Sequence, residues 1–419
     1  MKIAFVSLPV TGHLNPMLAL AAEVQSRGHD VVFVSIPDVE ARALGAGLCF
    51  LTVGNEHLPP GNTKMAEKQF SIRQGEEGLK FTFDLMATVT GAIVREVEAR
   101  LASEHPDGVV FDTYQPYLEL SAIALNLPYV HVSNAVHFDV SGETPLCFFD
   151  WEPSDSAEAK ERNLTGVEHF RKLLEPSLQV AKEYASEKKI EVDWSDIKAT
   201  RSKLAWITQL PAEFDFGGTN LNEALFHAGP FVNEQLRPSV EFPWDRLNGA
   251  PLVYTSMGTL QNGIESVFRH ILKAASELQD IQFVVAMGDK LDHASFEQIP
   301  ENVLLVDFAP QLELLKRASL CITHAGLNTV LESLTNGVPL VALPVTNDQP
   351  GVAARIRTKG VGDFLTTSEL SAERLKDLIQ RVLSDPEYRK NAKFIARAIA
   401  RTNGIASAAE EIESAFSKV

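Results

Sequence analysis

The chain has 419 residues, of which 45% are hydrophobic and 22% are charged, and its formal net charge is −17. This balance is that of an ordinary folded protein and excludes fibrous, collagen-like and disordered classes, and the length predicts two or three domains because one hydrophobic core rarely grows beyond about 300 residues. A strongly acidic chain repels nucleic-acid backbones and anionic headgroups, so we expect no nucleic-acid partner.

The first elements of the chain predict a β-α-β unit. Residues 2–8 are mostly apolar, as in a strand buried on both faces, and Pro9 and Gly12 break that pattern. A helix follows, with apolar residues at helical spacing up to a stop at Gly28, and residues 31–36 form the next strand. A doubly wound first domain is completed by a helix at 83–104, a strand at 108–111, a helix at 117–125 and a strand at 129–132.

The middle of the chain changes character. Residues 150–199 are rich in Glu, Lys, Ser and Asp with apolar positions at helical spacing, so we expect amphipathic helices over the mouth of the first domain. Residues 204–208 return to a strand. The prolines that follow, at 230, 238, 243 and 251, mark an irregular connection. We therefore place an N-terminal domain at 1–235 and a linker at 236–250.

The second half repeats the architecture of the first without an evident sequence repeat. Its expected elements are strands at 252–256, 282–286, 303–307, 320–323 and 339–343 and a helix at 266–278. They predict a second doubly wound domain at 251–395. The last helical stretch, 386–416, is interrupted near Asn403-Gly404, and its length suggests that residues 396–419 cross back to the N-terminal domain.

The chain carries no recognisable targeting or membrane signal. The apolar run of the N-terminal segment MKIAFVSLP is too short for a signal peptide, and no later stretch is long enough to span a bilayer. The three cysteines, Cys49, Cys147 and Cys321, lie far apart and predict neither a disulfide framework nor a metal site. We expect a cytoplasmic protein.

One helix start in the second half is the predicted binding site for a diphosphate. The strand at 320–323 ends in His324-Ala325-Gly326, and Asn328 or Thr329 is available to cap the helix that follows. Free N–H groups and the partial positive charge of a first helical turn attract phosphate, and Gly326 lets the backbone approach closely. His324 adds a donor at the same place.

Three further side chains suit a nucleotide sugar. Glu332 lies one turn along the same helix, where its carboxylate can accept hydrogen bonds from ribose hydroxyls. Asp348 and Gln349 follow a buried strand, at the edge where open α/β sheets bind ligands, and can hold sugar hydroxyls.

The candidate base is His13, directly after the first buried strand. Attack by a hydroxyl on an anomeric carbon needs a base whose pKa lies near the working pH, and histidine meets that condition. A lone histidine at a strand end is more often structural, and Asp112, which ends the strand GVVFD, is by itself typical of a turn.

These residues together resemble the donor-binding box of family 1 glycosyltransferases, and the chain is most similar to the bacterial zeaxanthin and macrolide members. The resemblance rests on FAPQ at 308–311, HAGLNT at 324–329, Glu332, GVP at 337–339, Pro344 and Asp348-Gln349, and it extends back to SLPVTGHLNP near the N-terminus. It implies the GT-B fold, with two facing Rossmann-like domains and a cleft between them, the first for the acceptor and the second for a nucleotide sugar. It also implies inversion at the anomeric carbon and no need for a metal or cofactor.

The resemblance also assigns roles to individual residues. Asp112 orients His13 and stabilises its charged form. In the donor site, Phe308 and Gln311 contact the nucleobase, Glu332 binds the ribose, and Asp348 and Gln349 bind the sugar. The residues that contact the diphosphate are His324, Asn328, Thr329, Ser256, Gly258 and Thr259. Phe308 and Leu327 stand where plant members carry Trp, so the choice between UDP and TDP stays open.

The acceptor is predicted to be an apolar small molecule with a hydroxyl group, of phenolic, terpenoid, carotenoid or macrolide type. This rests on the many phenylalanines of the first domain, although any one Phe is more typical of core packing. The candidate acceptor-binding residues are Phe81, Phe83, Asn134, His137, Phe138 and Phe148.

The predicted reaction is a single displacement that moves a hexose from a nucleotide sugar to the acceptor hydroxyl. The expected hexose is glucose, and the expected donor is a UDP-sugar, with a TDP-sugar as the alternative. The sequence contains no Asp-x-Asp pair, so no metal site is expected. Two alternatives remain, a catalytically silent sensor of nucleotide sugars and a sugar-nucleotide 2-epimerase. A dehydrogenase is disfavoured, because VTGHLNP replaces the G-x-G-x-x-G turn.

Overall fold

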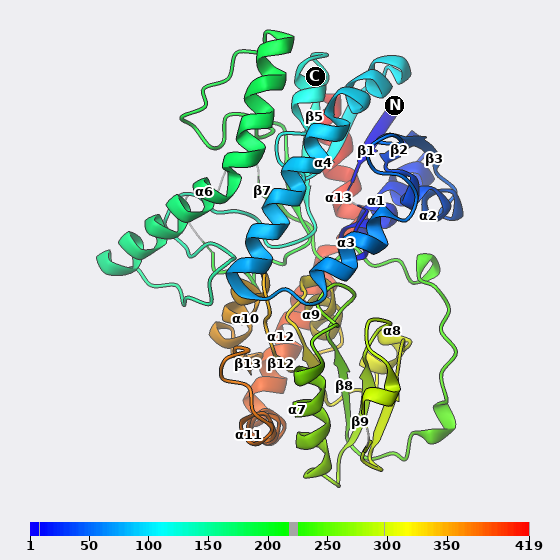
Figure 1. The fold of residues 1–419 in the computed structure, drawn as a ribbon, viewed down its shortest axis with the longest axis vertical. Helices are drawn as coiled ribbons and strands as arrows, with labels where there is room; N and C mark the ends of the chain where they lie inside the picture. The colour runs from blue at the N-terminus through cyan, green and yellow to red at the C-terminus, as the bar shows by residue number, and fades with distance from the viewer. Residues whose placement is uncertain (8, 218–224, 297, 419) are drawn as a thin grey trace.

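The computed structural model describes residues 1–7, 9–217, 225–296 and 298–418. It contains two parallel sheets, one in each half of the molecule, each with helices around it (Figure 1). Leu8, the last residue of the strand predicted at 2–8, lies outside the described residues, as do residues 218–224, Glu297 and Val419.

The first sheet has seven parallel strands in the order β3-β2-β1-β4-β5-β6-β7. Its strands are β1 (Lys2–Val6), β2 (Asp30–Ser35), β3 (Cys49–Thr52), β4 (Gly108–Asp112), β5 (Tyr129–Ser133), β6 (Trp206–Thr208) and β7 (Leu225–His227). Its helices are α1 (Thr11–Ser26), α2 (Glu40–Gly45), α3 (Asn62–Phe70), α4 (Gly75–Glu104), α5 (Leu120–Ile123) and α6 (Ala157–Lys188). Helices cover both faces, which is why a central strand such as β4 is buried at every position.

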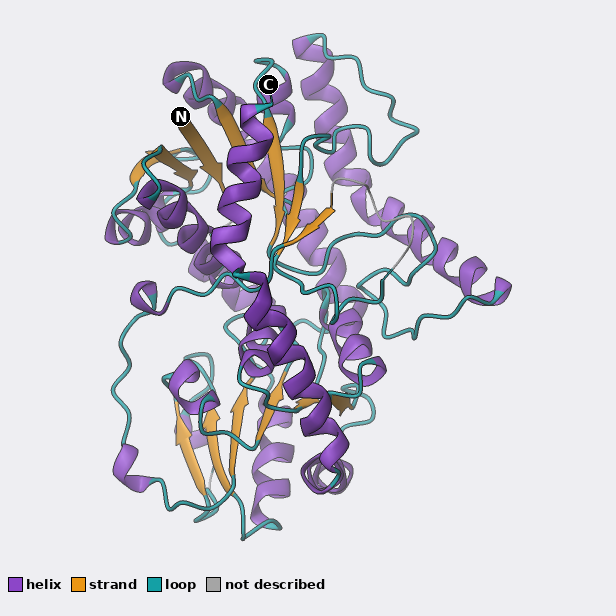
Figure 2. Cartoon of the chain, turned by 180° about the vertical axis from the view of Figure 1, so that it is seen from behind, coloured by secondary structure: helices purple, strands orange, loops and turns teal. Residues whose placement is uncertain are grey.

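The second sheet has six parallel strands in the order β10-β9-β8-β11-β12-β13. Figure 2, which views the molecule from behind, shows this sheet below the first. Its strands are β8 (Leu252–Ser256), β9 (Gln282–Ala286), β10 (Val303–Val306), β11 (Leu320–Thr323), β12 (Leu340–Ala342) and β13 (Gly362–Phe364). Its helices are α7 (Glu265–Ser276), α8 (Gln311–Leu315), α9 (Leu327–Thr335), α10 (Gln349–Thr358), α11 (Ala372–Ser384) and α12 (Pro386–Thr402). Between the sheets, residues 236–250 contain only short 3₁₀ turns.

Each sheet has one point where the strand order reverses, and ligands of open α/β sheets bind at such points. In the first sheet β1 lies beside β4, so the loop after β1 and the end of β4 meet there. In the second sheet β8 lies beside β11. The topology therefore places His13 with Asp112, and Ser256 with His324.

The C-terminal helix α13 (Gly404–Ser417) packs beside α1 of the first half, as Figure 1 shows in red. Asn403 separates it from α12 and adopts a positive φ of 59°, so the chain turns at the predicted interruption. Arg27 donates to Glu413 at 2.8 Å, and the ring of Phe416 packs against Gly108. The limits of the two domains themselves stay a prediction.

Four expectations need correction. The middle segment forms one long helix, α6, which packs along α4 and contributes no residue to the cavity described below, so it does not cover that mouth. The helix predicted at 117–125 is α-helical only over Leu120–Ile123, and the strand predicted at 204–208 begins at Trp206. The prediction also missed three short strands, β3, β7 and β13. Each has three or four residues, too few for a period to be read.

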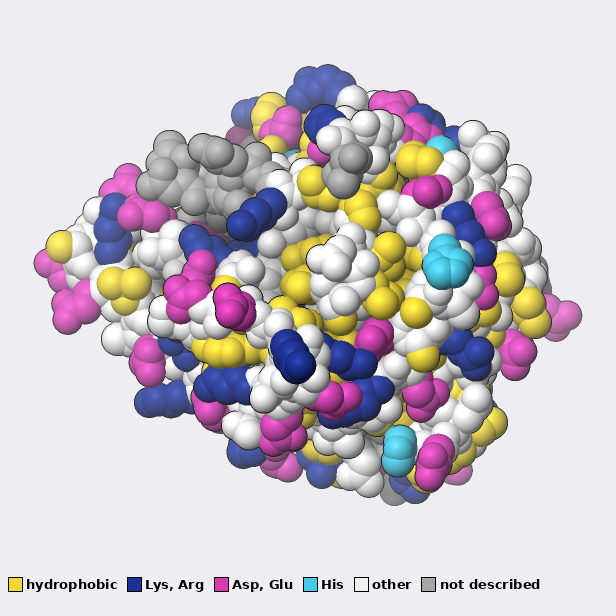
Figure 3. Space-filling view, turned by 90° about the horizontal axis from the view of Figure 1, so that it is seen from above, with side chains coloured by type: hydrophobic (Ala, Val, Ile, Leu, Met, Phe, Trp, Pro, Cys, Tyr) yellow, Lys and Arg dark blue, Asp and Glu magenta, His cyan; other side chains and the backbone are white. Residues whose placement is uncertain are grey.

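The surface shows charges of both signs. On the face drawn in Figure 3, Lys and Arg side chains gather in the lower centre, with Asp and Glu side chains among them. None of the described helices combines the length and apolar character that a bilayer crossing requires.

Candidate active site

A cavity of about 1320 Å³ lies between the two sheets. Its wall combines the loop after β1 and the end of the first sheet with the N-terminus of α9 and the loop after β12 of the second. Gly12 and Asn328, which are 316 positions apart in the chain, therefore face one space.

In the first half, His13 and Asp112 form a hydrogen-bonded pair at the cavity wall. His13 Nδ1 lies 2.9 Å from Asp112 Oδ2 and 3.1 Å from Oδ1. Asp112 also accepts from the Tyr114 amide at 3.0 Å and from Asn134 Nδ2 at 2.9 Å, so its orientation is fixed on both oxygens. The Tyr114 ring lies 4.8 Å from the imidazole. Because Nδ1 is engaged, Nε2 is the nitrogen left for a ligand.

The environment of His13 raises its pKa above the ordinary value of 6.5. Burial alone would lower the pKa, but the charge of Asp112 and its hydrogen bond outweigh burial, and Asp348 adds to the increase. The site therefore stabilises the imidazolium that a histidine base becomes when it takes a proton.

In the second half, His324 lies between two glycines. A Cβ atom at Gly258 or at Gly326 would overlap the imidazole, so this arrangement accepts only glycine at either position. Burial lowers the pKa of His324 to about 4, so the ring is neutral at neutral pH. Ser256, Gly258, Thr259 and His324 all line the cavity, where the sequence predicted phosphate contacts.

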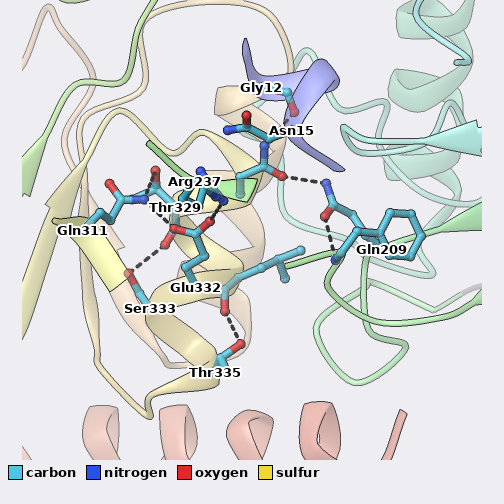
Figure 4. Close-up of polar contacts among 12 residues, drawn as sticks. Gly12, Asn15, Gln209, Arg237, Gln311, Thr329, Glu332, Ser333 and Thr335 are labelled. Atoms are coloured by element: carbon cyan, nitrogen blue, oxygen red, sulfur yellow. Dashed lines mark hydrogen bonds and ion pairs between the residues drawn. The ribbon is translucent and has the colours of Figure 1, made fainter. Parts of the chain in front are cut away.

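The start of α9 differs from the prediction. Its cap is Gly326, with no side-chain cap, because Asn328 lies inside the first turn and reaches the other half of the molecule. Asn328 Nδ2 donates to the Gly12 carbonyl at 2.6 Å, and Asn328 Oδ1 accepts from Gln209 at 2.7 Å; Figure 4 labels both partners. A diphosphate contact by Asn328 would exchange these bonds. Ala325, just before the cap, has a positive φ of 67°, a strained conformation typical of functional sites.

Glu332 is held by partners from two directions, as Figure 4 shows. Arg237 from the linker forms an ion pair with its Oε1, and Gln311 Nε2 donates to its Oε2 at 2.5 Å. Burial raises the pKa of Glu332, and both partners oppose that increase. Gln311 also accepts from the Tyr254 hydroxyl at 3.0 Å. Gln311, which was predicted to contact the nucleobase, therefore lies directly beside Glu332, the predicted ribose contact.

Asp348 lies where the second sheet meets the first. Its Oδ2 accepts from the Val136 amide at 3.1 Å, and burial raises the pKa of its carboxyl group. Asp348 lines the cavity, as do Thr329 and Phe308, and Phe308 is 53% exposed. The Asp348 carboxylate therefore faces the same cavity as His13, the predicted catalytic base, and the residues predicted to bind the diphosphate.

Gln349 also lines the cavity, and its side chain holds the loop after β12 in shape. Its Oε1 accepts from the Val345 and Thr346 amides, and its Nε2 donates to Gln261 at 3.1 Å. A sugar contact by Gln349 would compete with these bonds.

Of the candidate acceptor residues, only Asn134 lines the cavity, and it also donates to Asp112 there. The other five do not line it, but Phe83 and Phe138 line a smaller cavity that shares Met86, Tyr114 and Gln115 with its wall, so the acceptor roles stay a prediction. Phe83, Phe138 and Phe148 pack against Phe170 in the core, Phe81 packs against Phe70 and Arg73, and His137 is buried 3.4 Å from Asp215. Aromatic content alone could not separate cavity wall from core.

Several residues of the wall were not predicted from the sequence. Arg42 and Arg237 line the cavity, the latter from the predicted linker, and Gln209 reaches the site through its hydrogen bond to Asn328. One apolar part of the wall comes from α3 and α4 and the segments before them, through Ile36, Leu58, Phe70, Leu85, Met86 and Val89. The helical spacing of the α4 residues was visible, but not which face meets the cavity.

A cavity between two doubly wound halves, with a His-Asp pair opposite a helix start suited to phosphate, is the arrangement of a nucleotide-sugar transferase. Residues 181–399 match the family model described as UDP-glucoronosyl and UDP-glucosyl transferase. A zeaxanthin glucosyltransferase of Pantoea ananas is 30% identical over 416 residues, which cover 98% of this chain and 95% of the relative. The chain therefore belongs to the UDP-glucoronosyl and UDP-glucosyl transferases, the family 1 glycosyltransferases of the predicted resemblance.

Other relatives and solved structures agree. A demethyllactenocin mycarosyltransferase of Streptomyces fradiae is 29% identical over 422 residues, covering 99% of this chain and 86% of the relative. The crystal structure of the glycotransferase of kitacinnamycin superposes with a TM-score of 0.77 at 21% identity, covering 99% of this chain and 98% of that one. The calicheamicin glycosyltransferase CalG4 gives 0.76 at 23% identity, with 100% and 98% covered. The predicted GT-B fold is confirmed.

Proposed function

We propose that this glycosyltransferase moves a hexose from a UDP-sugar to a hydroxyl of an apolar small molecule, and that glucose is the preferred hexose. The reaction inverts the configuration of the anomeric carbon and needs no metal ion or cofactor. The observation that carries the proposal is the His13–Asp112 pair, which opens onto the same cavity as the start of α9. A base and a diphosphate site on opposite walls suit direct displacement.

The donor would lie along the second half of the molecule. The nucleobase packs on Phe308, and the ribose hydroxyls bind Glu332. The diphosphate accepts hydrogen bonds from the backbone N–H groups at the start of α9, with His324 and Ser256 beside it. The choice of UDP follows the description of the family, and the choice of glucose follows the name of the zeaxanthin glucosyltransferase. TDP is the competing nucleotide, since the solved structure of VinC, similar in fold, holds DTDP.

The acceptor would lie along α3 and α4. The apolar residues there, Leu58, Phe70, Leu85, Met86 and Val89, favour a large hydrophobic molecule with its hydroxyl near His13. Zeaxanthin and oleandomycin appear in the names of relatives, and carotenoid diols and macrolides fit such a wall.

In the reaction, the acceptor oxygen attacks the anomeric carbon while His13 Nε2 takes its proton. The bond from that carbon to the diphosphate oxygen breaks, and the electron pair leaves with the diphosphate. Asp112 stabilises the imidazolium. Attack opposite the leaving group inverts the configuration, and no covalent intermediate with the enzyme forms.

A donor and acceptor screen tests the proposal. The purified protein is incubated with UDP-glucose or TDP-glucose and with phenols, terpenoid alcohols, carotenoid diols and macrolides, and products are identified by mass spectrometry. We expect a hexose adduct on an apolar acceptor, formed faster with UDP-glucose and unaffected by a chelator. Nucleotide binding without any adduct, whatever the donor, would instead support the sensor alternative.

The acid limb of the pH profile reports on His13. Since the pKa of His13 is raised above its ordinary value of 6.5, a higher pH is needed before the neutral base predominates, and kcat/KM should rise with pH through a midpoint above 6.5. In Asp112→Asn the charge that raises the pKa is removed while burial still acts, so the midpoint should move to lower pH as the maximal rate falls. An identical midpoint in wild type and Asp112→Asn would show that another group controls the limb.

A further inference from the structure

The cavity has an uneven distribution of charge. Among the described residues that line it, the only lysine or arginine side chains are Arg42 and Arg237. Carboxylates are more numerous, in keeping with the acidic chain, and the lining members are Glu67, Glu234, Glu241, Asp307, Glu313, Glu332 and Asp348. An anionic ligand would therefore find permanent positive charge only at the two guanidinium groups.

The residues assigned to the diphosphate cannot supply that charge. His324 is neutral because burial lowers its pKa to about 4. Asn328, Thr329 and Ser256 are neutral side chains, and Asn328 is bonded to Gly12 and Gln209. The start of α9 offers about half a positive charge, well short of the charge of a pyrophosphate.

Arg42 and Arg237 come from different elements, α2 and the linker, but lie close enough for their charges to interact. Arg42 Nη2 donates to Asn15 Oδ1 of α1, and among the described residues no carboxylate forms an ion pair with Arg42. Burial, followed by the like charge of Arg237, lowers the pKa of Arg42, and a guanidinium stays protonated regardless. Arg42 is therefore a cation without an ion pair in the described part of this wall, and guanidinium groups bind phosphate through strong charge-assisted hydrogen bonds.

Arg237 is linked to the nucleotide site through Glu332. Its guanidinium pairs with the carboxylate that the ribose hydroxyls would need, and its side chain is 28% exposed. Glu332 and the start of α9 are separated by less than about two turns of helix, roughly 9 Å, which a long arginine side chain can cover. A nucleotide that takes Glu332 therefore frees a cation beside its own phosphates.

We propose that Arg42 and Arg237 form a pyrophosphate-binding subsite, and that Arg237 enters it by exchanging Glu332 for the phosphate when the ribose binds. This inference rests on the proposed function, and it adds two specific phosphate contacts from the first half and the linker. The two arginines would then hold the leaving diphosphate as its charge increases during transfer.

Calorimetric titration with UDP and with uridine separates this role from a structural one. In Arg42→Ala and Arg237→Ala, the ratio of the uridine Kd to the UDP Kd should fall by about 10- to 100-fold each, since a charge-assisted contact to phosphate is lost. Uridine itself should bind Arg237→Ala as well as wild type or better, because Glu332 is no longer paired. Higher salt should weaken UDP binding to the wild type more than to either variant.

Arg269→Ala is the control, because this exposed arginine on α7 pairs with Glu265 outside the cavity, and it should leave both affinities unchanged. If uridine and UDP affinities change by the same factor in both cavity variants, the arginines do not bind phosphate and the inference is overturned. If the wild type binds neither UDP nor TDP, the proposed function fails together with the inference, which is a different result from an unchanged ratio.

Discussion

Replacing His13 by alanine is expected to lower the rate of sugar transfer by about 10²- to 10⁴-fold while UDP binding persists. Among the described residues of the first half that line the cavity, His13 is the only histidine. Asp112 holds its ring, and Tyr114 and Asn134 in turn hold Asp112. Removing the ring leaves the donor side of the cavity intact, because no hydrogen bond joins the His13 side chain to a described residue of the second half.

Initial rates with saturating UDP-glucose and acceptor give the turnover, and calorimetry with UDP gives the binding. His270→Ala, on α7 and outside the cavity wall, is the matched control and should keep full activity. Transfer by His13→Ala at the wild-type rate would remove histidine from the mechanism. Loss of both turnover and UDP affinity would mean that the substitution had disturbed the fold around Gly12, whose carbonyl accepts from Asn328.

The sequence predicted the parts of the site that lie in short, local motifs. Asp112 ends the buried strand β4, and His13 lies in the first turn of α1, shortly after the buried strand β1. His324 to Glu332 run from the end of β11 into α9, so the spacing of these residues in the sequence predicts their positions. Parallel sheets place all strand ends at one edge, which is why both groups were expected at a cleft. Their predicted chemical roles await the experiments above.

The residues that the sequence could not predict act across long separations. Arg237 meets Glu332 at a separation of 95 residues, and Gln209 meets Asn328 at 119. Neither residue has a local pattern, because a single Arg in a Pro-rich connection is usually a solvated charge. The same limit applies to the acceptor wall, since Phe83 and Met86 are both buried residues of α4 but only Met86 lines the cavity.

Replacing Arg355 by methionine is expected to cost about 3–5 kcal/mol of stability, the largest loss we predict for a single substitution. Arg355 of α10 is 2% exposed and donates to Asp215 Oδ1 at 2.9 and 3.0 Å, joining the second half of the molecule to the loop after β6. Burial alone would raise the pKa of Asp215, but the charge of Arg355, its hydrogen bonds and the neighbouring histidines together outweigh burial and lower the pKa to about 2. Without Arg355 the buried carboxylate keeps only the Phe216 amide and the neighbouring His137 as partners and loses its permanent countercharge.

Urea unfolding of the variants measures this effect, with Arg357→Met as the control on the same helix. Arg357 pairs with Asp363 at 2.6 Å but its side chain is 39% exposed, so its loss should cost only about 1 kcal/mol or less. Arg355→Met combined with Asp215→Leu should recover much of the loss, since both charges leave the interior together. Equal midpoints for Arg355→Met and Arg357→Met would show that solvent reaches Asp215. Because α10 begins at Gln349, weakening this contact should also loosen the loop that is predicted to bind the sugar.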